Sequence, residues 1–364
     1  DRLEGGLGAD SLYGGNGNDT IYSDDGADVI DGGADIDLLL FTGGTNRVVV
    51  NLSTSAITYD TTNQLAANSV LDVVGYTDTV VNLSIENVTG GTGADTFMGS
   101  TGDNTLNGGD GNDYFYSSVG ADSIIGGNGT DTLDFTNLTT TAGVNGTLTS
   151  FAFNSGGTYT TTASGLENFT GSAQNDNFTG DGAANLLIGG AGADTLKGMA
   201  GADVIYGGIG DDSIDGGAAN DTLYGDAGND LFTIDFSSVD TIDGGANTLK
   251  DTVKFNAGNT GTNISSDTNF VMSSTLTNIE KLDITGLTLN TANNNTEFAF
   301  TEAMINTWTG STTGNLTLSF TSAQREKIMF TDSSSVVHDS AATIVDNATY
   351  TIGTHSLTID ITDI

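Results

Sequence analysis

A large apolar side chain recurs every nine residues in three blocks of the chain, always two positions after an Asp or an Asn. Sixteen acidic or amide positions share this register. They are Asp10, Asp19, Asp28, Asp37, Asp95, Asn104, Asp113, Asp122, Asp131, Asp176, Asn185, Asp194, Asp203, Asp212, Asp221 and Asp230. The apolar residues are Leu12, Ile21, Ile30, Leu39, Phe97, Leu106, Phe115, Ile124, Leu133, Phe178, Leu187, Leu196, Ile205, Ile214, Leu223 and Phe232. A flexible linker has no reason to keep this pairing, so the pattern predicts an ordered repeat.

The repeating unit reads Gly-Gly-x-Gly-x-Asp-x-U-x, where U is the large apolar residue, and residues Gly14 to Tyr22 match it throughout. Because glycine tolerates positive φ, we expect the Gly-rich part to turn sharply and to aim carbonyl oxygens inward. The last three residues are expected to form a short strand whose middle side chain points into the coil. Two units, or 18 residues, then close one turn of a coil. Successive turns should stack about 4.8 Å apart.

Stacked Gly-rich turns of this kind can build a calcium site. Carbonyl oxygens and one carboxylate from each turn would form an all-oxygen cage, the environment of about 6 to 8 ligands that Ca²⁺ prefers. The predicted partners are Asp10 with Asp28, Asp19 with Asp37, Asp95 with Asp113, Asp113 with Asp131, Asp194 with Asp212, Asp203 with Asp221, and Asp212 with Asp230. Asn104 and Asn185 lack the charge, so their pairs with Asp122 and Asp203 should bind calcium more weakly.

The unit resembles the nonapeptide of the repeats-in-toxin (RTX) family, a calcium-binding parallel β-helix signature. In that family the sixth-position Asp supplies side-chain ligands and the preceding Gly-rich residues supply carbonyls. The resemblance therefore implies several bound Ca²⁺ ions. The implied carboxylate ligands are Asp10, Asp19, Asp28, Asp37, Asp95, Asp113, Asp122, Asp131, Asp176, Asp194, Asp203, Asp212, Asp221 and Asp230. The implied carbonyl ligands are Gly6, Gly8, Gly15, Gly17, Gly91, Gly93, Gly109, Gly111, Gly127, Gly129, Gly190, Gly192, Gly208 and Gly210.

Segments rich in Thr, Val, Asn and Ser separate the three blocks and are typical of β-strands. The predicted fold class is all-β, with several short calcium-binding parallel β-rolls linked by β-rich inserts and a C-terminal β cap that contains a short helix at 301–308. The predicted organisation is a first roll at 1–40, an insert at 41–89, a second roll at 90–134, an insert at 135–170, a third roll at 171–255, and a cap with a secretion-signal region at 256–364. The repeat slips in phase at Asp240 and Asp251, where the third roll is expected to end.

The two inserts share an ending, because Ser-Ile-Glu-Asn-Val-Thr-Gly closes the first at residues 84–90 and Gly-Leu-Glu-Asn-Phe-Thr-Gly closes the second at 165–171. This motif resembles a lead-in strand found before RTX rolls. Two roles are open for Glu86 and Glu167. We favour a structural role, in which the Glu closes the first coil by hydrogen bonds, over the role of an additional calcium ligand.

The outward positions of the third roll include an apolar stripe that contains Ile188, Tyr206 and Tyr224. In the second roll, Met98, Tyr114 and Tyr116 occupy similar outward positions. An exposed apolar stripe usually marks a contact surface. Packing against the chain's own inserts is the favoured interpretation, and contact with a neighbouring subunit is the other.

The charge balance excludes several partners. The chain has 8 Lys and Arg against 47 Asp and Glu, a formal net charge of -39, and no Cys. Nucleic acid is excluded as a partner, since binding it requires neutralisation of phosphates by basic residues. No apolar run is long enough to span a bilayer. Without metal the clustered carboxylates repel one another, so we expect calcium binding to supply much of the folding free energy.

No catalytic motif accompanies the repeats, and His338 and His355 are interpreted as ordinary packed or surface residues. The chain is therefore expected not to be an enzyme. The favoured function is that of a secreted, calcium-dependent structural protein of the bacterial cell surface, a surface-layer or matrix-forming component exported by type I secretion. It would self-associate or attach to cell-surface polysaccharide. The alternative is a C-terminal RTX module of a large adhesin, or of a secreted enzyme or toxin whose catalytic part lies upstream.

Overall fold

The computed structural model describes most of the first two thirds of the chain and short strands beyond it. The described residues are 1–23, 26–41, 47–58, 64–71, 77–80, 84–139, 142–154, 158–234, 238–245, 251–255, 275–277, 279, 281–283, 298–300, 315–321, 328–331, 337–338, 349–352 and 355–362. They fall into two compact units, Asp1–Thr179 and Gly180–Ile364. Every regular element among these residues is a β-strand, which confirms the all-β class. The helix expected at 301–308 lies outside the described residues.

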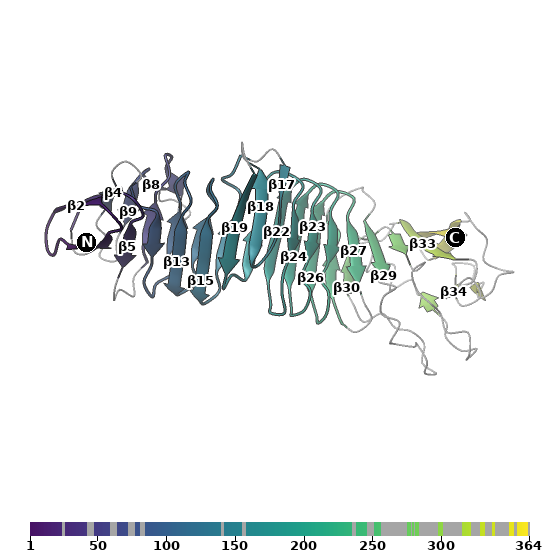
Figure 1. Ribbon diagram of the computed structural model, residues 1–364. Helices are drawn as coiled ribbons and strands as arrows, with labels where there is room; N and C mark the ends of the chain where they lie inside the picture. Colours follow the sequence, from purple (N-terminus) through teal and green to yellow (C-terminus); the bar gives the residue numbers. More distant parts are fainter. Residues whose placement is uncertain are drawn as a thin grey trace. The chain divides into compact units, whose positions relative to one another are not determined.

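Each nonapeptide forms one strand, and strands two repeats apart pair in parallel (Figure 1). β2 (Ser11–Asn16) pairs with β4 (Val29–Ala34), and this register places Leu12 opposite Ile30. On the other face, β1 (Arg2–Glu4), β3 (Thr20–Ser23) and β5 (Leu38–Phe41) pair in the same way. The 18-residue coil expected from the sequence is therefore confirmed.

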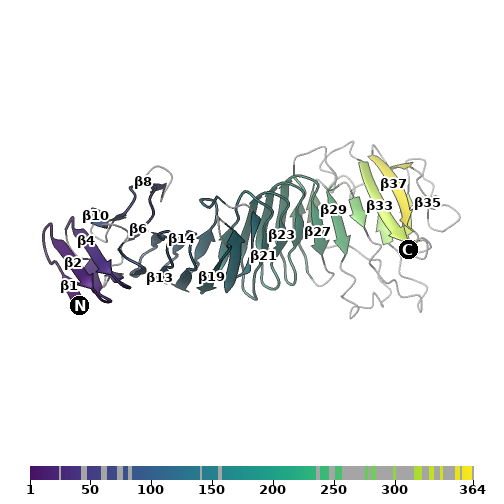
Figure 2. The same cartoon turned by 45° about the horizontal axis from the view of Figure 1, so that its top comes forward.

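The first insert adds strands to one face of the coil in unit 1 and leaves the other face continuous. The added strands are β6 (Val49–Asn51), β9 (Ser69–Leu71) and β10 (Thr77–Val80). They connect β4 to β12 (Thr96–Met98) through two parallel and two antiparallel pairings (Figure 2). On the opposite face β5 pairs directly with β11 (Asn87–Thr89). On this face, parallel pairing therefore continues directly from the coil before the insert to the coil after it.

The second insert adds strands to the opposite face of the coil and leaves the first face continuous. Its strands are β17 (Ala142–Thr147), β18 (Ser150–Asn154) and β19 (Thr158–Ser164). β19 pairs in parallel with β15 (Ser123–Asn128), and β17 pairs in parallel with β21 (Asn177–Thr179). On the other face β16 (Thr132–Asp134) pairs directly with β20 (Asn168–Thr170). β13 (Thr105–Asp110) and β14 (Tyr114–Tyr116) complete the regular coils between the inserts.

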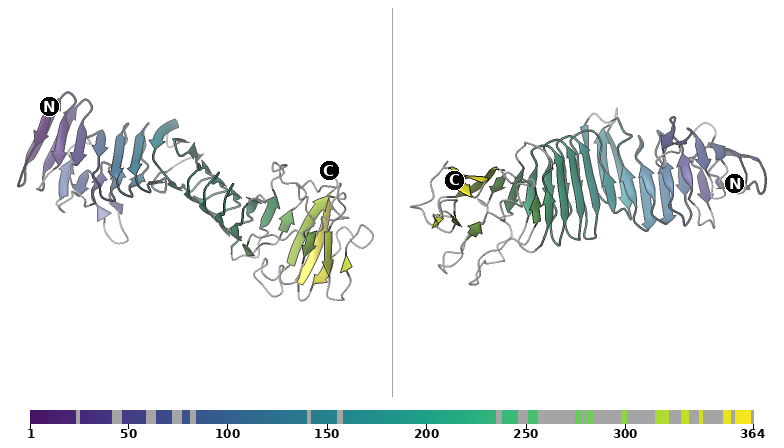
Figure 3. Two further views of the ribbon diagram at one scale, coloured as in Figure 1. Left: turned by 90° about the horizontal axis from the view of Figure 1, so that it is seen from below. Right: turned by 180° about the vertical axis from the view of Figure 1, so that it is seen from behind.

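Unit 2 repeats the two-faced coil with its own strands (Figure 3). One face contains β22 (Leu186–Ala191), β24 (Val204–Ile209), β26 (Thr222–Ala227), β28 (Thr241–Asp243) and β30 (Thr275–Thr277). The other contains β23 (Thr195–Lys197), β25 (Ser213–Asp215), β27 (Leu231–Ile234), β29 (Thr252–Phe255), β31 (Lys281–Asp283) and β33 (Asn315–Thr321). Parallel pairing therefore continues beyond the residues at which the repeat slips in phase.

Five further pairings complete the described strands. β37 (His355–Thr362) lies parallel to β33 and antiparallel to β36 (Thr349–Ile352). β34 (Ile328–Thr331) pairs with β32 (Phe298–Phe300) and β35 (Val337–His338). β7 (Ile57–Thr58) and β8 (Gln64–Leu65) form a hairpin in the first insert. A search of the described residues finds no helix that could cross a membrane.

The middle residue of each repeat strand is buried inside the coil, as the sequence predicts. Ile21, Leu39, Phe97 and Phe115 are fully buried, and the rings of the last two stack with centroids 5.2 Å apart. Burial of an aromatic or branched aliphatic side chain contributes about 1.5 to 3 kcal/mol. The core therefore contains two inward apolar side chains per coil, one from each face, and the polar turns lie at its two edges.

The first insert also covers part of the outer surface of unit 1. Val49, Ile57 and Leu65 form a buried cluster, and Met98 and Tyr116 pack against it from the outside of the coil. The favoured interpretation of the outer stripe, packing against the chain's own insert, is therefore confirmed for these two residues.

Candidate metal centre

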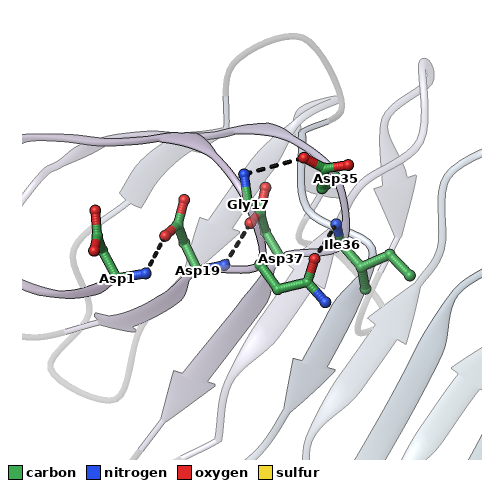
Figure 4. Close-up of polar contacts among 7 residues, drawn as sticks. Asp1, Gly17, Asp19, Asp35, Ile36 and Asp37 are labelled. Atoms are coloured by element: carbon green, nitrogen blue, oxygen red, sulfur yellow. Dashed lines mark hydrogen bonds and ion pairs between the residues drawn. The ribbon is translucent and has the colours of Figure 1, made fainter.

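The sixth-position Asp residues form a buried ladder along the edge of the coil. Each of them comes directly before a strand, so the coil spacing places equivalent residues one above the other. The backbone N–H of Asp19 donates a hydrogen bond of 2.8 Å to Oδ1 of Asp37 (Figure 4). The N-terminal ammonium group of Asp1 donates in turn to Oδ1 of Asp19. One carboxylate oxygen of each residue thus binds the main chain of the preceding coil.

The same bond recurs in both units at N···O distances from 2.7 to 2.9 Å. The donor and acceptor residues are Asp10 and Asp28, Asp19 and Asp37, Asp95 and Asp113, Asn104 and Asp122, Asp113 and Asp131, Asn185 and Asp203, Asp194 and Asp212, Asp203 and Asp221, and Asp212 and Asp230. The structure therefore brings together every carboxylate pair that the sequence predicts.

The second oxygen of many ladder carboxylates is buried and has no hydrogen-bond partner. These orphaned Oδ2 atoms belong to Asp10, Asp19, Asp37, Asp113, Asp131, Asp203, Asp212 and Asp230. A buried, unpartnered carboxylate oxygen is costly, and buried charges in proteins are normally paired or bound to a metal. The described residues contain no group of three or more His, Cys, Asp or Glu side chains that could hold a metal by themselves. A bound cation would need main-chain carbonyl oxygens as well.

Oxygen atoms from two coils converge beside the first glycine of the regular turns. A Cβ atom on Gly14 would lie 2.4 Å from Oδ2 of Asp19 and 2.3 Å from the carbonyl oxygen of Gly32 in the next coil. A carboxylate oxygen and a carbonyl oxygen thus converge on a space that any larger residue would fill. The same convergence is found at Gly90, Gly108, Gly189, Gly198, Gly207 and Gly225.

The sequence prediction names the second and fourth glycines of the turn as carbonyl ligands, whereas the carbonyl oxygen that lies beside the ladder carboxylate belongs to the first glycine. The predicted glycines stack closely on one another. A Cβ on Gly127 would lie 1.9 Å from the carbonyl oxygen of Gly109, and a Cβ on Gly129 would lie 1.7 Å from that of Gly111. Both Gly127 and Gly129 have positive φ, at 115° and 146°. This close approach explains why these positions are glycine, and their role as calcium ligands stays a prediction.

Some ladder positions satisfy their second oxygen within the protein. Ser118 Oγ donates to Asp122 Oδ2 at 2.9 Å, and the backbone N–H of Ser172 donates to Asp176 Oδ2 at 2.7 Å. In each of these turns a serine stands where a regular turn has its second glycine.

Two further ladder positions also have protein partners. The backbone N–H of Ser100 donates to Asn104 Oδ1 at 2.8 Å. The backbone N–H of Gly91 donates to Asp95 Oδ2 at 2.9 Å. The predicted ligands Asp95, Asp122 and Asp176 therefore differ from the orphaned carboxylates in having this oxygen occupied.

Burial and neighbouring charges raise the pKa values of several ladder carboxylates. Burial raises the pKa of Asp113 and of Asp230 to about 7, and the nearby carboxylates of Asp95 and Asp131 add to the effect at Asp113. Burial also raises the pKa of Asp122, Asp203 and Asp212 to about 6. Ionisation of these five carboxylates is thus less favourable in the folded chain than in water, and a nearby cation would favour it.

Sequence reasoning missed two later ladder positions. The backbone N–H of Asp221 donates to Oδ1 of Asp240 at 3.1 Å, and that of Asp230 donates to Oδ1 of Asp251 at 2.8 Å. Each acceptor lies two residues before a fully buried apolar side chain, Ile242 or Val253. This Asp-x-apolar pattern is the signal that could have identified them.

Glu86 and Glu167 also lie in the ladder. Oε2 of Glu86 accepts the backbone N–H of Asp37 at 2.9 Å, and Oε2 of Glu167 accepts that of Asp131 at 2.8 Å. Each Glu forms a hydrogen bond as expected, but its partner is the last coil of the preceding block and not the first coil of the next one.

The fold and the ladder together define a parallel β-roll whose turns converge oxygen atoms between coils. Comparison with known families gives the same class. The family model for the RTX calcium-binding nonapeptide repeat matches residues 1–39, 89–124, 118–136, 162–196 and 197–232. These segments of the chain are RTX calcium-binding nonapeptide repeats. No curated protein matches the chain.

The residues present fit the calcium that this family binds. The matched segments contain all fourteen Asp residues predicted from the sequence. Calcium takes only oxygen ligands, and the turns offer orphaned carboxylate oxygens beside carbonyl oxygens and a glycine without a Cβ atom. A bound ion would supply the positive charge that the buried carboxylates lack.

Proposed function

We propose that this chain is an extracellular, calcium-dependent structural protein that folds after type I export and assembles at a bacterial cell surface. In this role it forms part of a surface layer or matrix, through self-association or attachment to cell-surface polysaccharide. The role requires no catalysis. The calcium dependence is supported by the position of the carboxylates that the sequence singles out, because they lie in the ladder between coils.

The orphaned carboxylate oxygens are the observation that carries the proposal. Without a cation, the folded chain must keep these oxygens buried with no partner, and with calcium each gains a positively charged one. Extracellular calcium modules are tuned to about 10⁻⁴ to 10⁻³ M, well above the calcium level inside a cell. The chain would therefore stay unfolded during export and fold outside.

The outer stripe of unit 2 supports lateral assembly. Tyr206 and Tyr224 stack with ring centroids 4.6 Å apart and an interplanar angle of 6°, and Ile188 lies in line with them on the next strand. All three side chains are half-buried. A regular row of apolar side chains on a repeating surface suits contact with a neighbouring molecule of the same kind.

Electron microscopy of the purified chain tests the proposal. We expect ordered sheets or extended assemblies in millimolar calcium, and their loss when a chelator is added. Dispersed single molecules at every calcium concentration would contradict the assembly part of the proposal. Replacing Tyr206 and Tyr224 by Ser should weaken assembly without changing calcium-dependent folding, because neither side chain lies in the turns.

A further inference from the structure

In unit 1 the ladder passes from Asp37 to Glu86 and from Asp131 to Glu167, and neither Glu belongs to a regular nonapeptide. At each place the next coil begins at the end of an insert, with a turn that does not follow the nonapeptide. The family match leaves out the first of these turns, since it stops at residue 39 and resumes at 89. Both turns nevertheless continue the ladder.

The first turn places Glu86 at the ladder position. The backbone N–H of Asn87 donates to the carbonyl oxygen of Asp37 at 3.0 Å, as that of Leu38 donates to Asp19 at 2.9 Å in a regular coil. Glu86 therefore stands one coil after Asp37, where a repeat would place an Asp. Its Oε2 accepts the N–H of Asp37, as Oδ1 of a ladder Asp would.

The first turn also rebuilds the regular convergence of oxygens. A Cβ on Gly32 would lie 2.5 Å from Oδ2 of Asp37 and 2.2 Å from the carbonyl oxygen of Ser84. Ser84 Oγ accepts the N–H of Gly32 at 2.9 Å, which fixes the position of this turn. Ser84 thus supplies the carbonyl that a glycine supplies in a regular coil.

The second turn repeats this arrangement independently. The backbone N–H of Asn168 donates to the carbonyl oxygen of Asp131 at 3.0 Å, so Glu167 holds the ladder position. A Cβ on Gly126 would lie 2.5 Å from Oδ2 of Asp131 and 1.8 Å from the carbonyl oxygen of Gly165.

The length of these turns gives a physical reason for glutamate. In a regular turn five positions separate the first glycine from the Asp, as from Gly14 to Asp19. Only two positions separate Ser84 from Glu86, and two separate Gly165 from Glu167. The additional methylene group of Glu extends the carboxylate from this shorter turn to the same N–H.

One oxygen of each preceding carboxylate lacks a hydrogen-bond partner. Asp37 and Asp131 are fully buried, and Oδ2 of each is unpartnered and faces the space beside Gly32 or Gly126. We propose that Asp37, Ser84 and Glu86 form one calcium site across the first insert, and that Asp131, Gly165 and Glu167 form a second across the other insert. This inference rests on the proposed calcium binding by the regular ladder.

A glutamine at either position separates this proposal from a purely structural role, because its carbonyl oxygen can still accept the N–H but carries no charge. The variants are Glu86→Gln, Glu167→Gln and the double variant. Glu4→Gln is the control, since it removes the same charge from an exposed position of unit 1. Asp113→Asn is the reference for a regular ladder site.

The measurement is the number of calcium ions bound per folded chain, from equilibrium dialysis and metal analysis of the folded fraction isolated by gel filtration. We expect each single variant to bind one ion fewer than the Glu4→Gln control, and the double variant two fewer. A double variant that binds as many ions as the control, with an unchanged half-saturating calcium concentration, would overturn the proposal. Since the two turns are independent, either single variant tests the claim if the other does not fold.

The reference variant separates failure of this inference from failure of the calcium ladder. If Asp113→Asn loses bound calcium and the Glu variants do not, the ladder binds calcium and only the insert sites are refuted. If the unaltered chain binds none, the proposed function fails instead. Glu86→Asp tests whether the length of the Glu86 side chain matters for calcium binding. It keeps the charge but shortens the side chain, so we expect a several-fold higher half-saturating calcium concentration, and an unchanged value would contradict the site.

Discussion

At the scale of single residues, the two oxygens of a ladder carboxylate have different roles. One oxygen accepts the N–H of the preceding coil, and the other either stays without a partner or binds a serine or main-chain donor of its own turn. This division was not predictable from the repeat, because Asp122 and Asp212 occupy equivalent positions in the pattern. Serine in the Gly-rich turn distinguishes them, and its effect depends on where its hydroxyl group points.

Asp212 and Asp122 form a matched pair for mutation. Both are buried, and burial raises the pKa of each to about 6, but only Asp212 has an orphaned Oδ2. We expect Asp212→Asn to raise the half-saturating calcium concentration by about 10- to 100-fold, the range typical of lost metal-site partners. Asp122→Asn should change it by less than about 3-fold, and calorimetric titration measures both. Equal losses in the two variants would contradict the division of roles.

The raised pKa values predict how acid affects the chain without calcium. Because the pKa of Asp113 and of Asp230 rises to about 7 in the folded state, that state binds protons more tightly than the unfolded chain. Stability without calcium should therefore increase as the pH falls from about 7 to about 4, and calcium affinity should decrease over the same range. Circular dichroism in calcium-free buffer at pH 8, 6 and 5 checks the first expectation. Less β-structure at pH 5 than at pH 8 would contradict it.

At the scale of elements, the period of nine predicts the coil and the inward side chains but not the path of the inserts. Leu12 and Ile30 face inward because local alternation fixes which side chain of a strand points into the coil. The first insert adds β6, β9 and β10 to one face while β5 pairs directly with β11 on the other. Such pairings join residues far apart in sequence, and Val, Thr and Asn patterns do not specify a partner strand.

The first glycine of the turn gives a prediction at this scale. In Gly207→Ala the new Cβ would lie 2.4 Å from Oδ2 of Asp212 and 2.8 Å from the carbonyl oxygen of Gly225. We expect loss of one calcium ion and destabilisation by about 1 to 3 kcal/mol, as for other overpacked sites.

Gly182→Ala is the matched control, because nothing lies within 4 Å of its Cβ position. Thermal unfolding in calcium should show a lower melting temperature for Gly207→Ala and little change for Gly182→Ala. A Gly207→Ala variant as stable and as calcium-rich as the control would show that the space beside this glycine holds no ion.

At the scale of the whole molecule, the chain carries a net charge of -39 with only 8 basic residues. Few salt bridges can therefore offset the repulsion among its carboxylates. A thin core with two inward apolar side chains per coil adds little stability beyond what folding requires. The sequence alone indicates both facts, and the buried, unpartnered oxygens locate where the missing positive charge is needed.

Far-ultraviolet circular dichroism of the same sample, first without calcium and then during a calcium titration, tests this claim most directly. We predict a largely unfolded spectrum without calcium and a cooperative change to β-structure as calcium is added, reversed by a chelator and not reproduced by magnesium. The same β-rich spectrum before and after removal of calcium would contradict the account.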